Sequence, residues 1–191
     1  MMKSQSKKTI YLALFGFQLL FLLIAFVITL VRGESISSIF SQTVSLLPIF
    51  IFLLIGIVSG FLIAHLIRLP VFQESYNKVL TLILGSRLGV FDYFIIALMS
   101  GVFEEILFRG VLQPMWGIWI TSIVFVLVHG YFNPFNRKTI PSALLVMCIT
   151  LALGGIYIYY GLIPAIAFHF GLDFAEMLRI RALAGKNTNK S

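Results

Sequence analysis

Two adjacent glutamates and an arginine lie within one long apolar stretch, at Glu104, Glu105 and Arg109. Each charge costs about 2.5–3.5 kcal/mol at the centre of a membrane helix, so charges inside a span indicate a functional site by default. Glu105 and Arg109 are four residues apart, share a helix face and are expected to pair, for structure or for function. Glu104 is turned about 100° from Glu105, which leaves its carboxylate free to meet another helix.

Two histidines are the candidates to meet Glu104. His129 ends another apolar run, and His169 lies in a later one, four residues before Asp173. Asp173 therefore shares a helix face with His169, where it can orient the imidazole or share in binding a ligand. At 1.5 Å per residue, Glu104, His129 and His169 lie about 12–19 Å from the same membrane face. We expect the three side chains to converge in one layer near the middle of the bilayer.

The elements that must hold these residues are membrane helices. Of the 191 residues, 60% are hydrophobic and only 11% are charged, whereas soluble domains carry about 25% charged residues. We therefore predict an all-α transmembrane bundle that forms a single integral membrane domain over residues 1–191. Residues 71–89 are expected to form an amphipathic helix on the membrane surface, with a plain loop as the alternative. About 20 residues cross the bilayer, and the roughly six expected spans are Thr9–Val31, Leu46–Leu69, Phe91–Leu112, Trp116–His129, Ile140–Tyr159 and Gly161–Leu178.

Basic residues alternate between the two ends of these spans. They are concentrated at the N-terminus, in 68–90, in 130–139 and at the C-terminus, whereas 32–45, 113–116 and the turn around Tyr160 carry little net charge. The positive-inside rule then predicts a multi-pass protein with both termini in the cytoplasm. The net charge of +7 is accounted for by these loops, so no nucleic-acid partner is expected. The chain is small, basic and without a targeting extension, which favours a bacterial cell membrane.

Several other features are expected to have structural roles. Gly56 and Gly60 form a small-residue face that allows close helix packing inside the bundle, with a contact between two copies of the chain as the alternative. His65 stands outside any motif and is expected to be a hydrogen-bond partner between helices. Glu176 is expected near Arg179 at the membrane surface, with the His169 face as the alternative.

The charged residues and histidines together resemble a known family, the CAAX prenyl protease and bacteriocin-processing (CPBP, or Abi) group of intramembrane proteases. Its motifs are two glutamates followed after three residues by arginine, phenylalanine followed after three by histidine, and histidine followed after three by asparagine or aspartate. They occur in family order over residues 91–178, the expected catalytic core. The matching residues are Glu104, Glu105, Arg109, Phe125, His129, His169 and Asp173.

The resemblance implies an intramembrane endopeptidase in which a glutamate-activated water attacks a peptide bond. Glu104 would be the general base, His129 would help to hold the water, and His169 would stabilise the oxyanion. In a metal-dependent version, a divalent ion such as zinc would be bound by Glu104, His129 and His169. The last motif position is commonly asparagine, whose amide can donate, whereas an ionised Asp173 can only accept, so its expected role is to orient His169 or to bind a metal.

The resemblance also implies a peptide or membrane-protein substrate. Eukaryotic members cut prenylated C-terminal peptides, and bacterial members are linked to bacteriocin maturation or self-immunity. Two other classes of function stay open. One is a non-catalytic bacteriocin self-immunity or binding protein of the membrane. The other is a small proton-coupled transporter, which should have broken helices or inverted halves that the sequence does not display.

Overall fold

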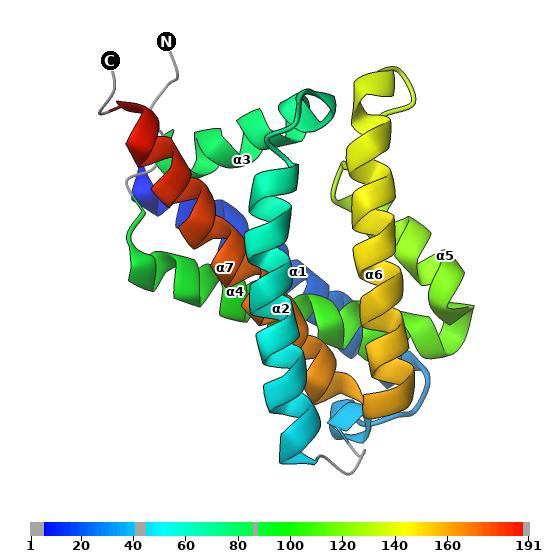
Figure 1. Ribbon diagram of the computed structural model, residues 1–191. Coiled ribbons are helices and arrows are strands. Elements are labelled where there is room, and N and C mark those ends of the chain that lie inside the picture. The colour runs from blue at the N-terminus through cyan, green and yellow to red at the C-terminus, as the bar shows by residue number, and fades with distance from the viewer. Residues whose placement is uncertain (1–5, 41–44, 86–87, 189–191) are drawn as a thin grey trace.

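The computed structural model describes residues 6–40, 45–85 and 88–188, and these ranges form helices and short connections without a strand. Figure 1 shows long helices crossing one another in a single bundle. The predicted all-α membrane class is confirmed. The main elements are α1 Lys7–Val31, α2 Leu46–Leu66, α3 Gln73–Gly85, α4 Val90–Glu105, the π-helical segment η3 Ile106–Leu112, α5 Gln113–Val128, α6 Ile140–Tyr160 and α7 Leu162–Thr188, with short 3-10 turns at Ile36–Phe40, Pro70–Phe72 and Arg137–Thr139.

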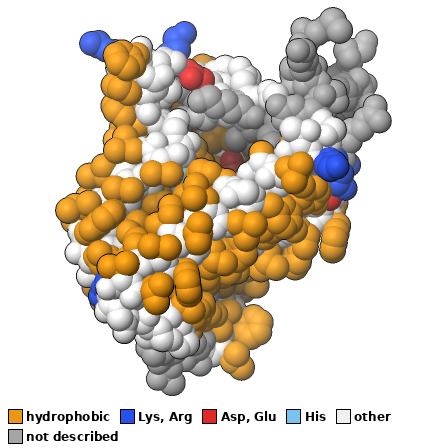
Figure 2. Space-filling view, turned by 180° about the vertical axis from the view of Figure 1, so that it is seen from behind, with side chains coloured by type: hydrophobic (Ala, Val, Ile, Leu, Met, Phe, Trp, Pro, Cys, Tyr) orange, Lys and Arg blue, Asp and Glu red, His pale blue; other side chains and the backbone are white. Residues whose placement is uncertain are grey.

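Four helices in the described part of the chain are long and apolar enough to cross a membrane: α1, α2, the run Val90–Val128, and Arg137–Tyr160. Figure 2 shows apolar side chains over most of one face. Only 11% of the most apolar stretch of α2 is buried inside the protein. The remaining apolar side chains face outwards, as they do where hydrocarbon is the solvent.

The predicted third and fourth spans form one continuous helical run with a bend. Gly117 interrupts it with φ 75°, a left-handed conformation that glycine adopts without a steric penalty. The 39-residue run would be about 58 Å long if straight, roughly twice the hydrocarbon core. The chain instead turns sharply within α5 (Figure 1). The turn expected at 113–116 is therefore corrected to Gly117.

The predicted sixth span corresponds to α7, which is not among the four apolar helices because Asp173, Glu176 and Arg179 lower its hydropathy. It nevertheless occupies the middle of the bundle, packed against α2 and α4. A count of six crossings stays a prediction for α5 and α7.

The small-residue face of α2 is buried against α7. A methyl group added at Gly56 would lie 2.2 Å from the carbonyl oxygen of Phe168, and one at Gly60 would lie 2.2 Å from that of Leu172. Such contacts allow no side chain, so the two backbones touch at these glycines. This is the expected packing inside the bundle, and α7 occupies this face of α2.

The connections fall at two ends of the bundle. In Figure 1 the start of α1, the end of α7, α3 and the start of α6 gather at one end, and the start of α2 and the α6–α7 turn lie at the other. The basic segments therefore share an end, although Lys3, Arg87 and Lys190 lie outside the described residues. Residues 73–85 of the expected surface segment form α3, whose Tyr76 and Leu80 pack against the bundle. Cytoplasmic placement of that end stays a prediction.

Candidate active site

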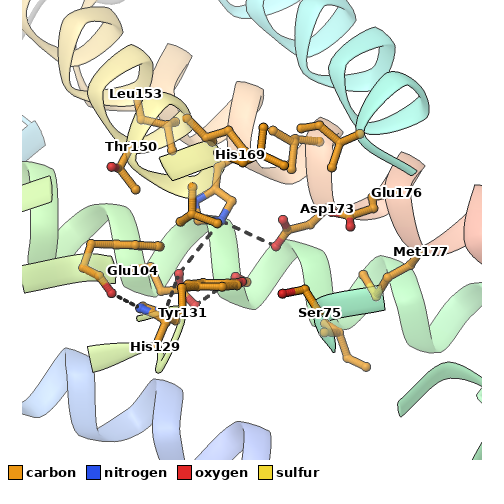
Figure 3. Close-up of a pocket in the computed structure, with 18 of the residues that line it drawn as sticks. Ser75, Glu104, His129, Tyr131, Thr150, Leu153, His169, Asp173, Glu176 and Met177 are labelled. Carbon is orange, nitrogen blue, oxygen red and sulfur yellow. Dashed lines mark hydrogen bonds and ion pairs between the residues drawn. The ribbon is translucent and has the colours of Figure 1, made fainter. Parts of the chain in front are cut away.

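The predicted site residues come from four elements. Glu104 and Glu105 end α4, Arg109 lies in η3, His129 directly follows α5, and His169 and Asp173 lie on α7. Figure 3 shows Glu104, His129 and His169 pointing toward one another, with Asp173 beside His169. The expected convergence of a carboxylate and two imidazoles is therefore present. α5 reaches the site from beside α6 and η3, rather than by packing closely against α7.

Glu104 is the centre of the cluster. Its Oε2 lies 3.3 Å from His129 Nε2 and 3.9 Å from His169 Nε2, and the residue is 5% exposed. Its Oε1 accepts hydrogen bonds from Gln18 Nε2 at 2.7 Å and from Ser100 Oγ at 2.9 Å. The two oxygens thus have different surroundings, one held by neutral donors and the other directed at the histidines.

Both imidazoles are held from the far side of the ring. His129 Nδ1 is 2.8 Å from the carbonyl oxygen of Phe125, on whose ring the imidazole stacks with centroids 4.0 Å apart. His169 Nδ1 is 2.9 Å from Glu105 Oε1. Carbonyl and carboxylate oxygens only accept, so each Nδ1 carries a proton, and each ring directs Nε2 at Glu104, as an acceptor whenever the ring is neutral. Within the described residues, buried His129 Nε2 has no hydrogen-bond partner, although it lies 3.3 Å from Glu104 Oε2.

Glu105 makes the predicted pair with Arg109, and both are fully buried. Their Oε2 and Nε atoms are 3.2 Å apart, but the geometry does not meet the angle of a hydrogen bond. The guanidinium also lies over the Phe125 ring, 5.8 Å from its centroid, at a distance where cation–π attraction operates. Glu105 therefore joins Arg109 through one oxygen and His169 through the other.

Asp173 lies beside His169, as its position on the same helix face predicts, but it does not hold the ring at Nδ1. Its Oδ2 is 3.5 Å from His169 Nε2, and its side chain is 26% exposed. The hydrogen bond that orients the ring runs instead from Nδ1 to Glu105. Helix periodicity identified Asp173 because it shares a face with His169, but it could not reveal a partner on α4.

A cavity of about 350 Å³ extends from the cluster. Besides Glu104 and the two histidines, its walls include Gln18, Ser75, Thr150, Asp173 and Glu176, among many apolar side chains. Figure 2 shows a hollow in which an acidic side chain is visible. The cavity brings water-compatible groups and apolar surface together beside one carboxylate.

Two of the expected structural roles are resolved by these contacts. Glu176 lines the cavity beside Asp173 (Figure 3), so its expected position beside Arg179 is wrong and the His169-face alternative holds. Arg179 instead donates from Nη2 to His65 Nε2 at 3.0 Å, while His65 Nδ1 donates to the Phe61 carbonyl oxygen. The interhelical role expected for His65 is confirmed.

Tyr131 is a cavity residue that the motifs did not indicate. It lies in the loop after α5. Burial raises the pKa of its phenol, and the nearby carboxylates of Glu176, Asp173 and Glu104 raise it further. Tyr131 is therefore a neutral hydroxyl at physiological pH, able to donate or accept one hydrogen bond.

The donor types at the site are those that zinc prefers, and each imidazole is held at Nδ1, as metal-bound histidines usually are. The placement of these donors differs from that of a zinc site. No group of three or more His, Cys, Asp and Glu side chains in residues 6–40, 45–85 and 88–188 is arranged to hold a metal ion. A metal site at Glu104, His129 and His169 would need these side chains to rearrange, and it stays a prediction.

Comparison with known proteins connects this geometry to a family. Residues 85–175 match the Rce1-like family model, described as type II CAAX prenyl endopeptidase Rce1-like. The matched segment contains every predicted site residue, whereas α1 and α2 precede it. Neither the curated proteins nor the solved structures compared with the chain give a match.

Proposed function

We propose, from the match of residues 85–175 to the CAAX prenyl endopeptidase family model, that the chain hydrolyses a peptide bond with a water activated by Glu104. The observation that carries the proposal is the pair of imidazole Nε2 atoms 3.3 Å and 3.9 Å from one oxygen of Glu104. A water among these acceptors can donate to Oε2 and to one Nε2, and can present its oxygen lone pair to a substrate carbonyl carbon.

The chemistry begins with proton transfer. Glu104 Oε2 takes a proton from the water as the oxygen bonds to the carbonyl carbon, which produces a tetrahedral intermediate with a negatively charged oxygen. His129 holds the water through Nε2. Glu104 then gives the proton to the amide nitrogen as the carbon–nitrogen bond breaks. The products are a new carboxyl terminus and a new amino terminus, and Glu104 returns to its ionised form.

His169 is assigned to the oxyanion. A second proton, at Nε2, converts the ring from an acceptor to a donor directed into the cavity. Glu105 fixes the ring by its bond to Nδ1, and the Oδ2 of Asp173, 3.5 Å from Nε2, attracts the protonated ring. Asp173 thus acts through His169 and does not itself donate to the oxyanion. No step of this proposal uses a metal ion.

The substrate class is inferred from the cavity and the family. Its volume of about 350 Å³ falls within the usual range for pockets that enclose small groups, and much of its wall is apolar. These features support a membrane-associated peptide or protein as the substrate, with a prenylated C-terminal peptide as the first to test. A bacterial cell membrane is the proposed location, and a bacteriocin self-immunity protein without turnover is the alternative.

The test is cleavage of a quenched fluorescent peptide with a prenylated C-terminal CAAX sequence by the protein in liposomes. Glu104→Gln should lower kcat by at least about 100-fold, as expected for loss of a general base. The matched control is Glu34→Gln, which changes a glutamate that is exposed and paired with Arg32. Equal turnover by Glu104→Gln would refute the glutamate mechanism, and lack of cleavage by the unaltered chain would favour the self-immunity alternative.

A further inference from the structure

The first helix contributes a buried amide to the site. Between Tyr11 and Thr29 the only amide or charged side chain of α1 is Gln18. It is 6% exposed, and it shares a helix face with buried Phe21 and Ala25, which pack against η3. Burying an amide costs free energy unless it forms hydrogen bonds. The position of this amide therefore needs a reason, which its contact with Glu104 supplies.

The contact fixes one oxygen of the proposed base. An ionised carboxylate only accepts, so the Gln18 Nε2 donates to Glu104 Oε1, at 2.7 Å. Ser100, one turn before Glu104 on α4, donates to the same oxygen at 2.9 Å. With Oε1 held by two donors from two helices, rotation of the carboxyl group is opposed. Oε2 is thereby kept directed at His129 and His169.

A second observation separates this role from ordinary helix packing. Within the described residues, the buried Oε1 of Gln18 has no hydrogen-bond partner, and the side chain lines the cavity. An amide that only joined two helices would not need to line the cavity that Glu104 also lines. Thr29, on the same face of α1, illustrates the structural case, since its hydroxyl lies within hydrogen-bond distance of the carbonyl oxygens of Ala25 and Phe26.

We propose that Gln18 is a positioning residue for hydrolysis: its amide orients Glu104, so that α1 completes an active site whose motifs all lie on later helices. The inference rests on the proposed function. It concerns a helix outside residues 85–175, the segment that matches the family. The free Oε1 of Gln18 is available to accept a hydrogen bond from the reacting water or from a substrate amide.

Three variants test the proposal with the prenylated fluorescent peptide in liposomes. Gln18→Leu removes the donor at similar size and should lower kcat by about 10- to 100-fold, since small misplacements of a reacting group have effects of this order. KM should change by less than about twofold. Thr29→Val, the matched loss of a buried polar group on α1, should leave both constants near those of the unaltered chain.

Gln18→Glu distinguishes a donor from a space-filling side chain and nearly preserves its shape. Only the protonated carboxyl can donate to Glu104, so its activity relative to the unaltered chain should rise as the pH falls. Gln18→Leu should stay low at every pH. If Gln18→Leu does not fold, this pH dependence alone decides the question: an unaltered pH profile would overturn the proposal.

An infrared measurement makes the outcome independent of substrate choice. The carboxylate stretching band of Glu104, isolated by subtracting the Glu104→Gln spectrum, should shift in Gln18→Leu and not in Thr29→Val. If kcat and the band are both unchanged in Gln18→Leu while Glu104→Gln is inactive, the positioning role is wrong and the proposed function stands. If Glu104→Gln is active, the proposed function fails, and with it any role of Gln18 in hydrolysis, whatever the band shows.

Discussion

Glu104 and Glu105 follow one another on α4, yet the two sides of the helix that they face are built differently. On the Glu105 side, the carboxylate is fully buried, paired with Arg109 and bonded to His169. On the Glu104 side, the carboxylate lines a cavity and faces the Nε2 atoms of two imidazoles. The same chemical group is a fixed support on one side and a reactive group on the other, and the difference lies in its neighbours.

Replacement by glutamine should cause a different loss at each position: stability at Glu105 and activity at Glu104. Glu105→Gln leaves the Arg109 guanidinium buried without a counter-charge, and breaking such a pair costs about 3–5 kcal/mol. Denaturant unfolding in detergent should show this loss. Glu104→Gln should unfold within about 1 kcal/mol of the unaltered chain, because its neighbours are neutral donors and imidazoles. Equal destabilisation by both variants would remove the distinction between support and reactive group.

A double variant sharpens the same point. Replacing Glu105 by glutamine and Arg109 by methionine removes both charges at similar volume, and such replacements are often neutral or stabilising. Most of the stability lost in Glu105→Gln should therefore return. Activity should not return, because the amide of the new glutamine cannot supply the carboxylate that fixes His169 Nδ1. A variant that regains stability and full turnover would show that His169 does not need the negative charge of Glu105, since the glutamine oxygen can still accept from Nδ1.

The packing of α2 on α7 should matter less, but measurably. Gly56→Ala places a methyl group 2.2 Å from the Phe168 carbonyl oxygen, next to His169, and overpacking of this kind costs about 1–3 kcal/mol. Unfolding measurements should detect it, with reduced turnover as α7 is displaced. The control is Gly16→Ala, where an added methyl meets nothing within 4 Å. If both alanine variants behave alike, the glycine contact has no energetic importance.

Removal of metal should have the smallest effect. Because the donors are not arranged as a metal-binding set in the described part of the chain, the protein treated with a strong chelator should keep its full turnover of the fluorescent peptide. Elemental analysis of the same sample must show that no stoichiometric metal remains. Loss of activity on chelation, with recovery on adding zinc, would show that Glu104, His129 and His169 rearrange into a metal site.

Much of this arrangement could be predicted from spacing within single helices. The four-residue separation indicated the Glu105–Arg109 pair, and the 100° turn per residue placed Glu104 on another face. Contacts between helices could not be predicted from spacing within one helix. The bond from Glu105 to His169 and that from Gln18 to Glu104 depend on how α1, α4 and α7 cross, which no single-helix periodicity contains.

The missed and corrected features have a common physical cause. Gln18 could have been found as an isolated amide in an apolar helix, a group that needs a partner in hydrocarbon. The bend at Gly117 was placed a residue too early, because hydropathy falls at 113–116 while the left-handed φ belongs to the glycine. The π-helical turns of η3 have no signal in composition, and Glu176 was misplaced because sequence proximity to Arg179 outweighed its seven-residue spacing from His169.

The central claim is that Glu104 activates water and does not itself attack the peptide bond. A single turnover of the prenylated peptide in water labelled with heavy oxygen tests it directly. The product's new carboxyl terminus should carry one labelled oxygen, and mass spectrometry of the enzyme should find no label in Glu104. An unlabelled product together with label in the Glu104 carboxyl group would indicate a covalent glutamyl intermediate and contradict the account.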